Sequence, residues 1–278
     1  MRDKRTGVMH RRWWATALLL TAAASTTRAT PPPPVPGAQE NIAWLWDQAA
    51  LPTWSQGQTA VLIQHILLSG RAVLERPRRD APALPAGVRV TPLLHVEVST
   101  VVPPVSIADS RETILHAMDR AARISTSGWV QLDMEARPSQ RAFYRELVAE
   151  IRARLPTDVR LSVTALAWWC RAGAIGSNPW LDGLAADEIV PMFFRMGKDR
   201  ARLRHFIEIG AAELHPRCRE GAAGFSTQEL FSSEVIRRYR RAYWFDNGRW
   251  RHGPRVGRVR TESTDVARSA MHNNANRP

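Results

Sequence analysis

Two acidic residues, two positions apart, are the strongest candidates for chemistry in this sequence. Asp133 and Glu135 end the stretch Gly-Trp-Val-Gln-Leu-Asp-Met-Glu, residues 128–135. Side chains alternate across a β-strand, so both acids and Gln131 share one face, opposite an apolar face. Neighbouring carboxylates can perform acid–base chemistry, because each raises the pKa of the other. We expect Glu135 to be the acid and Asp133 to orient it; a buried polar ladder is the alternative.

The elements around this stretch predict a barrel. A strand with an apolar outer face and a polar inner face suits a barrel in which helices cover the outside and acids lie at the carboxyl-terminal mouth. A helical pattern follows over residues 138–155, and another covers 111–124. The sequence therefore predicts an α/β fold, a TIM-like (β/α)8 barrel, irregular in its first quarter where connections are short. The eight expected strands cover residues 41–46, 59–68, 90–99, 128–135, 160–168, 188–196, 221–227 and 241–245.

Several other residues are candidates for substrate binding. Indole rings stack well on sugars, and Trp168 and Trp244 lie beside the ends of expected strands, although core packing is the usual role of tryptophan. Glu97 shares the inner face of strand 90–99 with His95, which we expect to be a hydrogen-bonded interior histidine rather than a ligand or base. No phosphate loop, nucleophile elbow or metal triad is apparent, so we expect no metal and no cofactor.

Arg195 is expected at the carboxyl end of strand 188–196. Its guanidinium could pair with Glu135 and lower the pKa of that acid, or pair with Asp133 and leave Glu135 free to be protonated. We predict the pair with Asp133.

The distribution of charge argues against a nucleic-acid ligand. The net charge is +13, yet residues 30–236 hold 22 basic and 22 acidic residues, so the surplus lies in the two ends. Residues 1–29 combine a basic start, a short apolar run and small residues, which predicts a signal peptide and export to the periplasm or beyond, with an uncleaved anchor as the alternative. A proline-rich spacer, 30–40, precedes the barrel domain, 41–252. The basic tail, 253–278, is expected to be disordered and could contact an anionic envelope surface.

Cys170 and Cys218 are the two cysteines of the chain. An exported chain with an even number of cysteines permits a disulfide, and two buried thiols are the alternative. Cys170 follows the expected strand 160–168 and Cys218 precedes strand 221–227, so both are expected near the same mouth.

Longer motifs carry a resemblance to a known family. They are Gln131-Leu132-Asp133, Ser139-Gln140-Arg141-x-Phe143-Tyr144, Leu161-Ser162-Val163-Thr164-Ala165-Leu166-Ala167-x-Trp169-Cys170 and Asp187-Glu188-x-Val190-Pro191-Met192-x-Phe194-Arg195-Met196-Gly197. This set resembles an exported bacterial family, domain of unknown function 3142, and the resemblance extends more loosely over most of the chain after the leader.

A shorter resemblance concerns chemistry. The Asp133-Met134-Glu135 sequence is similar to the end of the motif of family-18 glycosidases, which are TIM barrels, and this resemblance implies that Glu135 is the acid. Gln131, Phe194 and Arg195 stand where those enzymes have Asp, Tyr and Asp. Because the missing groups hold the acetamido group of the substrate, cleavage of N-acetylglucosamine polymers with help from that group is not expected.

The residues and the resemblances together predict an exported protein similar to glycoside hydrolases, with a carbohydrate as ligand or substrate and Glu135 as general acid. Such an enzyme needs a second carboxylate, for which Glu97, Glu229 and Asp47 are the candidates. The alternative is a barrel that binds a glycan or has a structural role in the envelope without catalysis.

Overall fold

The computed structural model describes residues 39–55, 57–171, 179–209, 214–219 and 221–246. The expected signal peptide, all but the last residues of the spacer and the basic tail lie outside these ranges and stay predictions. Among the helices of the described part, none is long and apolar enough to cross a lipid bilayer.

The described elements alternate as the sequence predicts from the third barrel strand onward. The strands are β1 (Glu40–Leu45), β2 (Gln58–Ser69), β3 (Ala72–Pro77), β4 (Arg89–Val98), β5 (Trp129–Met134), β6 (Arg160–Leu166), β7 (Glu188–Met192), β8 (Ala222–Ser226) and β9 (Arg241–Phe245). The α-helices are α1 (Arg111–Ile124), α2 (Arg141–Arg154), α3 (Pro179–Asp182), α4 (Arg200–Ile209) and α5 (Ser233–Arg237). The 3-10 helices are η1 (Ala108–Ser110), η2 (Pro138–Gln140), η3 (Ala167–Cys170), η4 (Gly197–Asp199) and η6 (Pro216–Cys218).

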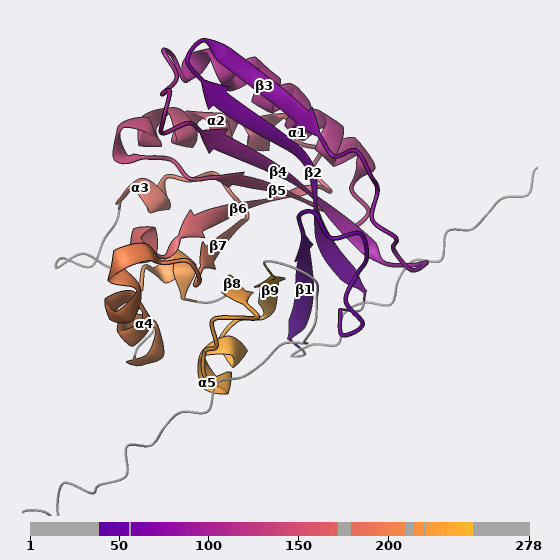
Figure 1. The fold of residues 1–278 in the computed structure, drawn as a ribbon, viewed down its shortest axis with the longest axis vertical. Helices are drawn as coiled ribbons and strands as arrows, with labels where there is room; N and C mark the ends of the chain where they lie inside the picture. The colour runs from indigo at the N-terminus through magenta and orange to yellow at the C-terminus, as the bar shows by residue number, and fades with distance from the viewer. Residues whose placement is uncertain (1–38, 56, 172–178, 210–213, 220, 247–278) are drawn as a thin grey trace, which may run out of the picture. The chain divides into compact units, whose positions relative to one another are not determined.

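Eight parallel strands close into a barrel, which confirms the predicted TIM-like fold. The sheet runs in the order β1-β9-β8-β7-β6-β5-β4-β2, and β1 also pairs in parallel with β2 (Figure 1). The ninth strand, β3, forms an antiparallel hairpin with β2 outside the ring. A hairpin therefore stands where the first helices of a regular barrel would lie, which is the irregular first quarter that short connections predict.

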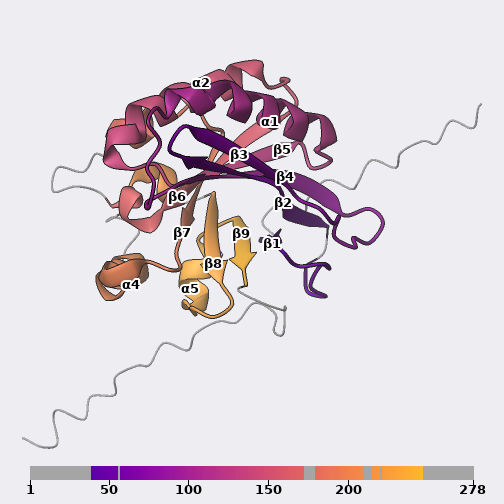
Figure 2. The ribbon, with the colours of Figure 1, turned by 45° about the horizontal axis from the view of Figure 1, so that its top comes forward.

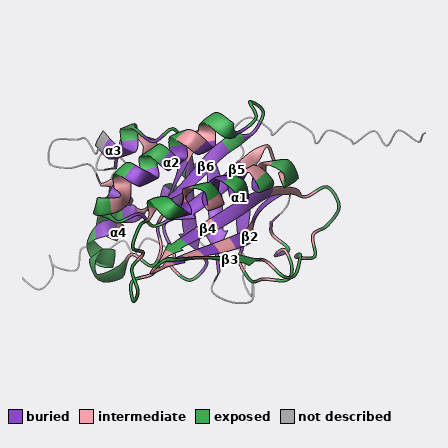
Figure 3. Ribbon diagram, turned by 90° about the horizontal axis from the view of Figure 1, so that it is seen from above, coloured by how far each residue is buried: buried purple, intermediate pink, exposed green. Residues whose placement is uncertain are grey.

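Helices α1 and α2 lie side by side on the outside of the barrel, with α1 over β4 and β5 (Figure 2). Apolar residues at helical spacing bury one face of each helix: Ile114, Leu115, Met118 and Ala121 on α1, and Phe143, Leu147 and Ile151 on α2. They pack on the outward side chains of the strands, including Val130 and Leu132 of β5. The opposite faces of both helices are exposed (Figure 3). The apolar face of β5 thus lies under helices, and its polar face points into the barrel.

Two strands end earlier than the sequence predicts. β6 ends at Leu166, and Trp168 lies in the 3-10 helix η3. β7 ends at Met192, and Arg195 beyond it adopts a left-handed backbone with a φ of 50°. Apolar residues directly after β6 and β7 continue the pattern of a strand, and for this reason the sequence predicts longer strands than the structure has.

Candidate functional site

A pocket of about 540 Å³ opens at the carboxyl-terminal mouth of the barrel. Its lining comes from the ends of strands β1, β4, β5, β6, β7 and β9 and from the turns that follow them. The described residues lining it are Trp44, Trp46, Leu93, His95, Val96, Glu97, Val98, Thr100, Asp133, Glu135, Ala136, Arg137, Pro138, Thr164, Leu166, Trp168, Met192, Phe194, Arg195 and Phe245. The mouth is where barrels of this type carry their ligands, because the loops there vary without disturbing the core.

Asp133 forms the buried floor of the acidic side of this pocket. Its Oδ2 lies 3.0 Å from Nδ1 of His95, the residue beside it in the β4–β5 register. Thr164 of β6 donates a hydrogen bond of 2.5 Å to Oδ1. Burial lowers the pKa of His95, but the bond to Asp133 and the charge of that carboxylate outweigh it, and the net pKa of His95 is raised. Asp133 therefore fixes the orientation of the His95 ring.

Glu135 directly follows Met134, the last residue of β5, and is exposed at the rim of the pocket. The pocket walls still desolvate its carboxyl, and this desolvation together with the charge of Asp133 raises the pKa of Glu135. His95 and Arg195 act in the opposite direction through their positive charge. A carboxyl with a raised pKa can hold a proton closer to neutral pH and donate it, which is the property a general acid needs.

Arg195 follows β7, which lies two strands round the barrel from β5 and its acids. Its backbone N–H donates to Oε1 of Glu229 at 2.8 Å, and its guanidinium lies over the Phe245 ring, 4.9 Å from the centroid. Phe245 in turn stacks on Phe194, with centroids 5.1 Å apart. The predicted pairing partner, Asp133, instead has His95 and Thr164 as hydrogen-bond partners. The charge of Arg195 acts on Glu135 through space, lowering its pKa.

The two tryptophans expected to bind sugar lie in different environments. Trp168 lines the pocket and is 41% exposed, with Arg141 stacked 5.3 Å from its ring centroid. The prediction that Trp244 binds sugar is wrong. Trp244 is 2% exposed, packs in the outer core and donates from Nε1 to Oδ1 of Asn41 at 2.9 Å. Its position on β9 turns the indole outward, away from the mouth, so it cannot contact a ligand there. Trp46, which sequence reasoning did not select, lines the pocket and tilts against His95 at 4.8 Å.

Gln131 and Glu229 support the site from outside the pocket. Gln131 is fully buried beneath it, where it accepts a 2.6 Å hydrogen bond from Nε1 of Trp44 and donates to Ser162. Glu229 holds the Arg195 backbone and lies 3.4 Å from the guanidinium of Arg200. Neither is among the described residues lining the pocket, so both substrate-binding assignments are corrected to positioning roles.

Glu97 is the third carboxylate in the pocket. It lies on β4 and forms an ion pair with Nε2 of His65 at 3.0 Å. All the carboxylates that line the described pocket, Glu97, Asp133 and Glu135, therefore come from the neighbouring strands β4 and β5. Asp47, the remaining candidate for a second carboxylate, lines a different pocket of about 520 Å³ between β2, β3 and β4.

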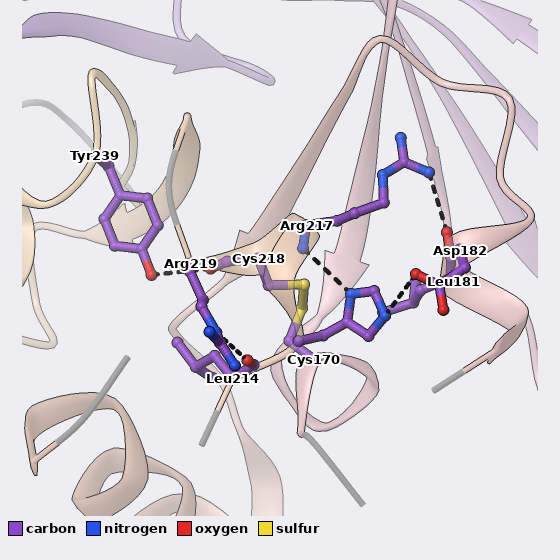
Figure 4. Close-up of a disulfide and its surroundings, with 9 residues drawn as sticks. Cys170, Leu181, Asp182, Leu214, Arg217, Cys218, Arg219 and Tyr239 are labelled. Atoms are coloured by element: carbon purple, nitrogen blue, oxygen red, sulfur yellow. Dashed lines mark hydrogen bonds and ion pairs between the residues drawn. A yellow bond between two sulfur atoms is a disulfide. The ribbon is translucent and has the colours of Figure 1, made fainter. Parts of the chain in front are cut away.

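Cys170 and Cys218 form a disulfide with a Cα–Cα separation of 5.8 Å (Figure 4). The backbone N–H of His215 donates to the Cys170 carbonyl at 2.7 Å, and the Tyr239 hydroxyl donates to the Cys218 carbonyl at 3.1 Å. Neither cysteine is among the described residues lining the mouth pocket. The helix η6 that carries Cys218 packs beside the amino-terminal ends of the strands, so Cys218 is not at the mouth as expected, whereas Cys170 ends η3, two residues after Trp168 of the pocket. The bond fastens the outer layer rather than the site.

The sequence matches no protein-family model and no curated protein. Among solved structures, the chain is similar to the Bacillus cereus spore cortex-lytic enzyme SleL, with 12% identity and a TM-score of 0.43. The match covers 70% of this chain and 52% of that one, so the chain spans about half the length of that structure. A likeness of this degree carries no argument about activity. Membership of the domain of unknown function 3142 stays a resemblance.

Proposed function

We propose that the protein binds a bacterial polysaccharide in the mouth pocket and that Glu135 acts there as the general acid on a glycosidic bond. The observation that carries the proposal is the Glu135 carboxyl, with its raised pKa, in a pocket whose walls include exposed indole. In hydrolysis the bond between the sugar carbon and the glycosidic oxygen breaks and a protonated Glu135 gives its proton to the departing oxygen, while water forms the new bond to the sugar carbon and gives up a proton.

The aromatic walls support carbohydrate as the ligand class. Trp168 presents a partly exposed ring that Arg141 supports from one side, and Phe194 and Phe245 form a flat stack on the other side of the mouth. Large apolar faces next to carboxylates and a guanidinium suit a sugar, which has both apolar ring faces and polar edges.

Export to the periplasm or beyond is part of the same proposal. The support comes from residues 1–29, which have the composition of a signal peptide, and from the Cys170–Cys218 disulfide. Disulfides persist in oxidising compartments outside the cytosol, where a polysaccharide of the cell envelope would also be met.

A second candidate is glycan binding without cleavage, and one observation favours it. Hydrolysis also needs a group that activates water, and in two-carboxylate glycosidases that group faces the acid across the bond. The described lining contributed by β7, the turn after it and β9 consists of Met192, Phe194, Arg195 and Phe245, with no carboxylate among them. Under this reading the acids would accept hydrogen bonds from sugar hydroxyls.

The experiment is a screen of the purified chain against bacterial polysaccharides, with binding measured by affinity electrophoresis and cleavage by release of reducing ends. For the hydrolase, Glu135→Gln should keep binding and lower turnover by about 10²–10⁴-fold. Glu234→Gln, at an exposed glutamate of α5, is the matched control and should change neither. Binding by the wild type with no release of reducing ends, together with weaker binding by Glu135→Gln, would select the binding protein.

Trp168→Ala tests the ligand class itself. Loss of the stacking ring should weaken binding by about 2–10-fold. Ile209→Ala, at an exposed apolar residue of α4, is the control for a surface truncation. If no polysaccharide binds, or if Trp168→Ala and Ile209→Ala bind equally well, the mouth pocket is not a glycan site.

A further inference from the structure

Two histidines and a glutamate come together beside the acid pair because of strand register. His65 of β2 is the direct lateral neighbour of His95 on β4. Adjacent parallel strands lie about 4.8 Å apart, so side chains at paired positions extend from the same face of the sheet. Glu97 follows His95 by two residues and therefore shares that face. The candidate ligand atoms of these three residues all lie within 4.8 Å of one another.

We propose that His65, His95 and Glu97 bind a divalent transition-metal ion of the zinc class. The proposal concerns metal binding and goes beyond the proposed action on glycans. Imidazole nitrogen and carboxylate oxygen are ligands that suit Zn²⁺, and three protein ligands leave one position open to water or a ligand. Magnesium and calcium prefer sites made of oxygen alone.

The distances suit such a site after small side-chain movements. Zinc–ligand bonds of about 2.0–2.1 Å place the ligand atoms of a tetrahedral site about 3.3 Å apart. Nε2 of His65 and Oε2 of Glu97 are already 3.0 Å apart. The third ligand must move closer, and Glu97, with a side chain 52% exposed, has the freedom to adjust.

The hydrogen bonds of His95 are those of a metal ligand. Its Nδ1 is bonded to Asp133, which leaves Nε2 as the ring nitrogen for a metal. A carboxylate on the other nitrogen of a ligating histidine fixes the ring and makes it a better donor. Asp133 is itself held by Thr164, so the support extends one further residue into the barrel. A contact between His65 and Glu97 alone would not require Asp133 and Thr164 to hold the ring of His95.

The cluster is accessible and its surroundings tolerate a cation. His95 and Glu97 line both the mouth pocket and the pocket beside it, and His65 lines the second one. Arg76, beside His65 in the β2–β3 register, brings a positive charge. Arg78 and Arg79 also line this pocket, and the carboxylates of Asp47, Asp80 and Glu97 match the three arginines in number.

The test is binding of Zn²⁺ and Co²⁺ to the tag-free chain after removal of metal with EDTA. Isothermal titration should show one site in the wild type, and bound Co²⁺ should give the strong visible absorption of a tetrahedral site. His65→Ala, His95→Ala and Glu97→Gln should each weaken Zn²⁺ binding by more than 10-fold. Asp133→Asn, which leaves all three ligands in place, should weaken it by about 10–100-fold.

The control is the histidine–glutamate pair on α1. His116 lies 4.0 Å from Glu112 on the exposed surface, and this pair is part of no cluster of three possible metal ligands among the described residues. His116→Ala should bind Zn²⁺ as the wild type does. Far-UV circular dichroism checks that each variant folds, and Glu97→Gln, at an exposed residue, provides a conservative test. Wild-type binding of Zn²⁺ that Glu97→Gln and His65→Ala both retain, or the absence of any binding, would overturn the proposal.

Discussion

A substitution at Gly224 tests how tightly the barrel interior packs around Trp44, which lines the mouth pocket. It lies on β8, where a Cβ would come within 2.5 Å of Cη2 and 2.6 Å of Cζ3 of Trp44. Real contacts of this kind do not occur, so in Gly224→Ala either the indole or the strand must move. Trp44 has little room, because it is bonded to Gln131 at 2.6 Å and stacked on Tyr243 with centroids 5.0 Å apart.

The expected cost of Gly224→Ala is that of overpacking a close-packed core, about 1–3 kcal/mol in the free energy of unfolding. Urea denaturation followed by tryptophan fluorescence measures it. Gly183→Ala is the matched control, since its Cβ would meet the flexible side chain of Arg145 at 3.0 Å and the Trp180 carbonyl at an ordinary contact distance of 3.8 Å. We expect the control to change stability by less than about 0.5 kcal/mol. If Gly224→Ala is as stable as the control, the indole is not held as tightly as these contacts require.

Three more predictions concern charge and the disulfide. Desolvation and Asp133 raise the pKa of Glu135, so its ionisation destabilises the folded state as pH rises from the pKa of the unfolded chain through that of the folded chain. Glu135→Gln should therefore stabilise the chain near neutral pH. It should have no effect at acidic pH, where the carboxyl is protonated in both the folded and the unfolded state. Arg195→Met should raise the pKa of Glu135 further, measured by carboxyl NMR on metal-free protein, and an unchanged or lower value would contradict the placement of Arg195. Replacing both Cys170 and Cys218 by serine should cost about 4 kcal/mol of unfolding free energy, from the entropy of closing a loop with a sequence separation of 48; a loss below about 1 kcal/mol would mean that the bond constrains little.

The barrel could be predicted from the sequence because its strongest signals are local. The inward acids and outward apolar residues of β5 fix which face lies under the helices, and the spacing of Ile114 and Met118 marks α1. The turns after β6 and β7 could not be predicted, because Trp168 after β6 and Phe194 after β7 continue an apolar pattern while the backbone leaves the strand. The sequence pattern also does not show which face of a short strand a tryptophan occupies. It places Trp244 at the mouth, whereas its side chain packs outside the barrel.

The His65 cluster shows a different limit. His95 and Glu97 are two residues apart, but His65 lies thirty residues earlier, and only the β2–β4 register brings it beside His95. That register includes an irregularity between Leu62 and Gln64, which changes the residue of β2 that faces each position on β4. Spacing along the chain therefore carries no sign of the cluster, and a search for metal motifs in the sequence finds none.

The two proposals meet at Glu97, which decides what the acidic wall of the pocket can do. A carboxylate that binds a metal ion through its oxygen is not free to act as the second carboxylate of a glycosidase. If Glu97→Gln loses Zn²⁺ binding and keeps polysaccharide turnover, then neither the metal nor Glu97 serves cleavage by Glu135. If Glu97→Gln loses both Zn²⁺ binding and polysaccharide turnover, then Glu97 is required for the activation of water as well as for the metal site. If it loses Zn²⁺ binding in a chain that binds glycan without turnover, the metal site belongs to a binding protein, and Asp133 serves chiefly to orient His95.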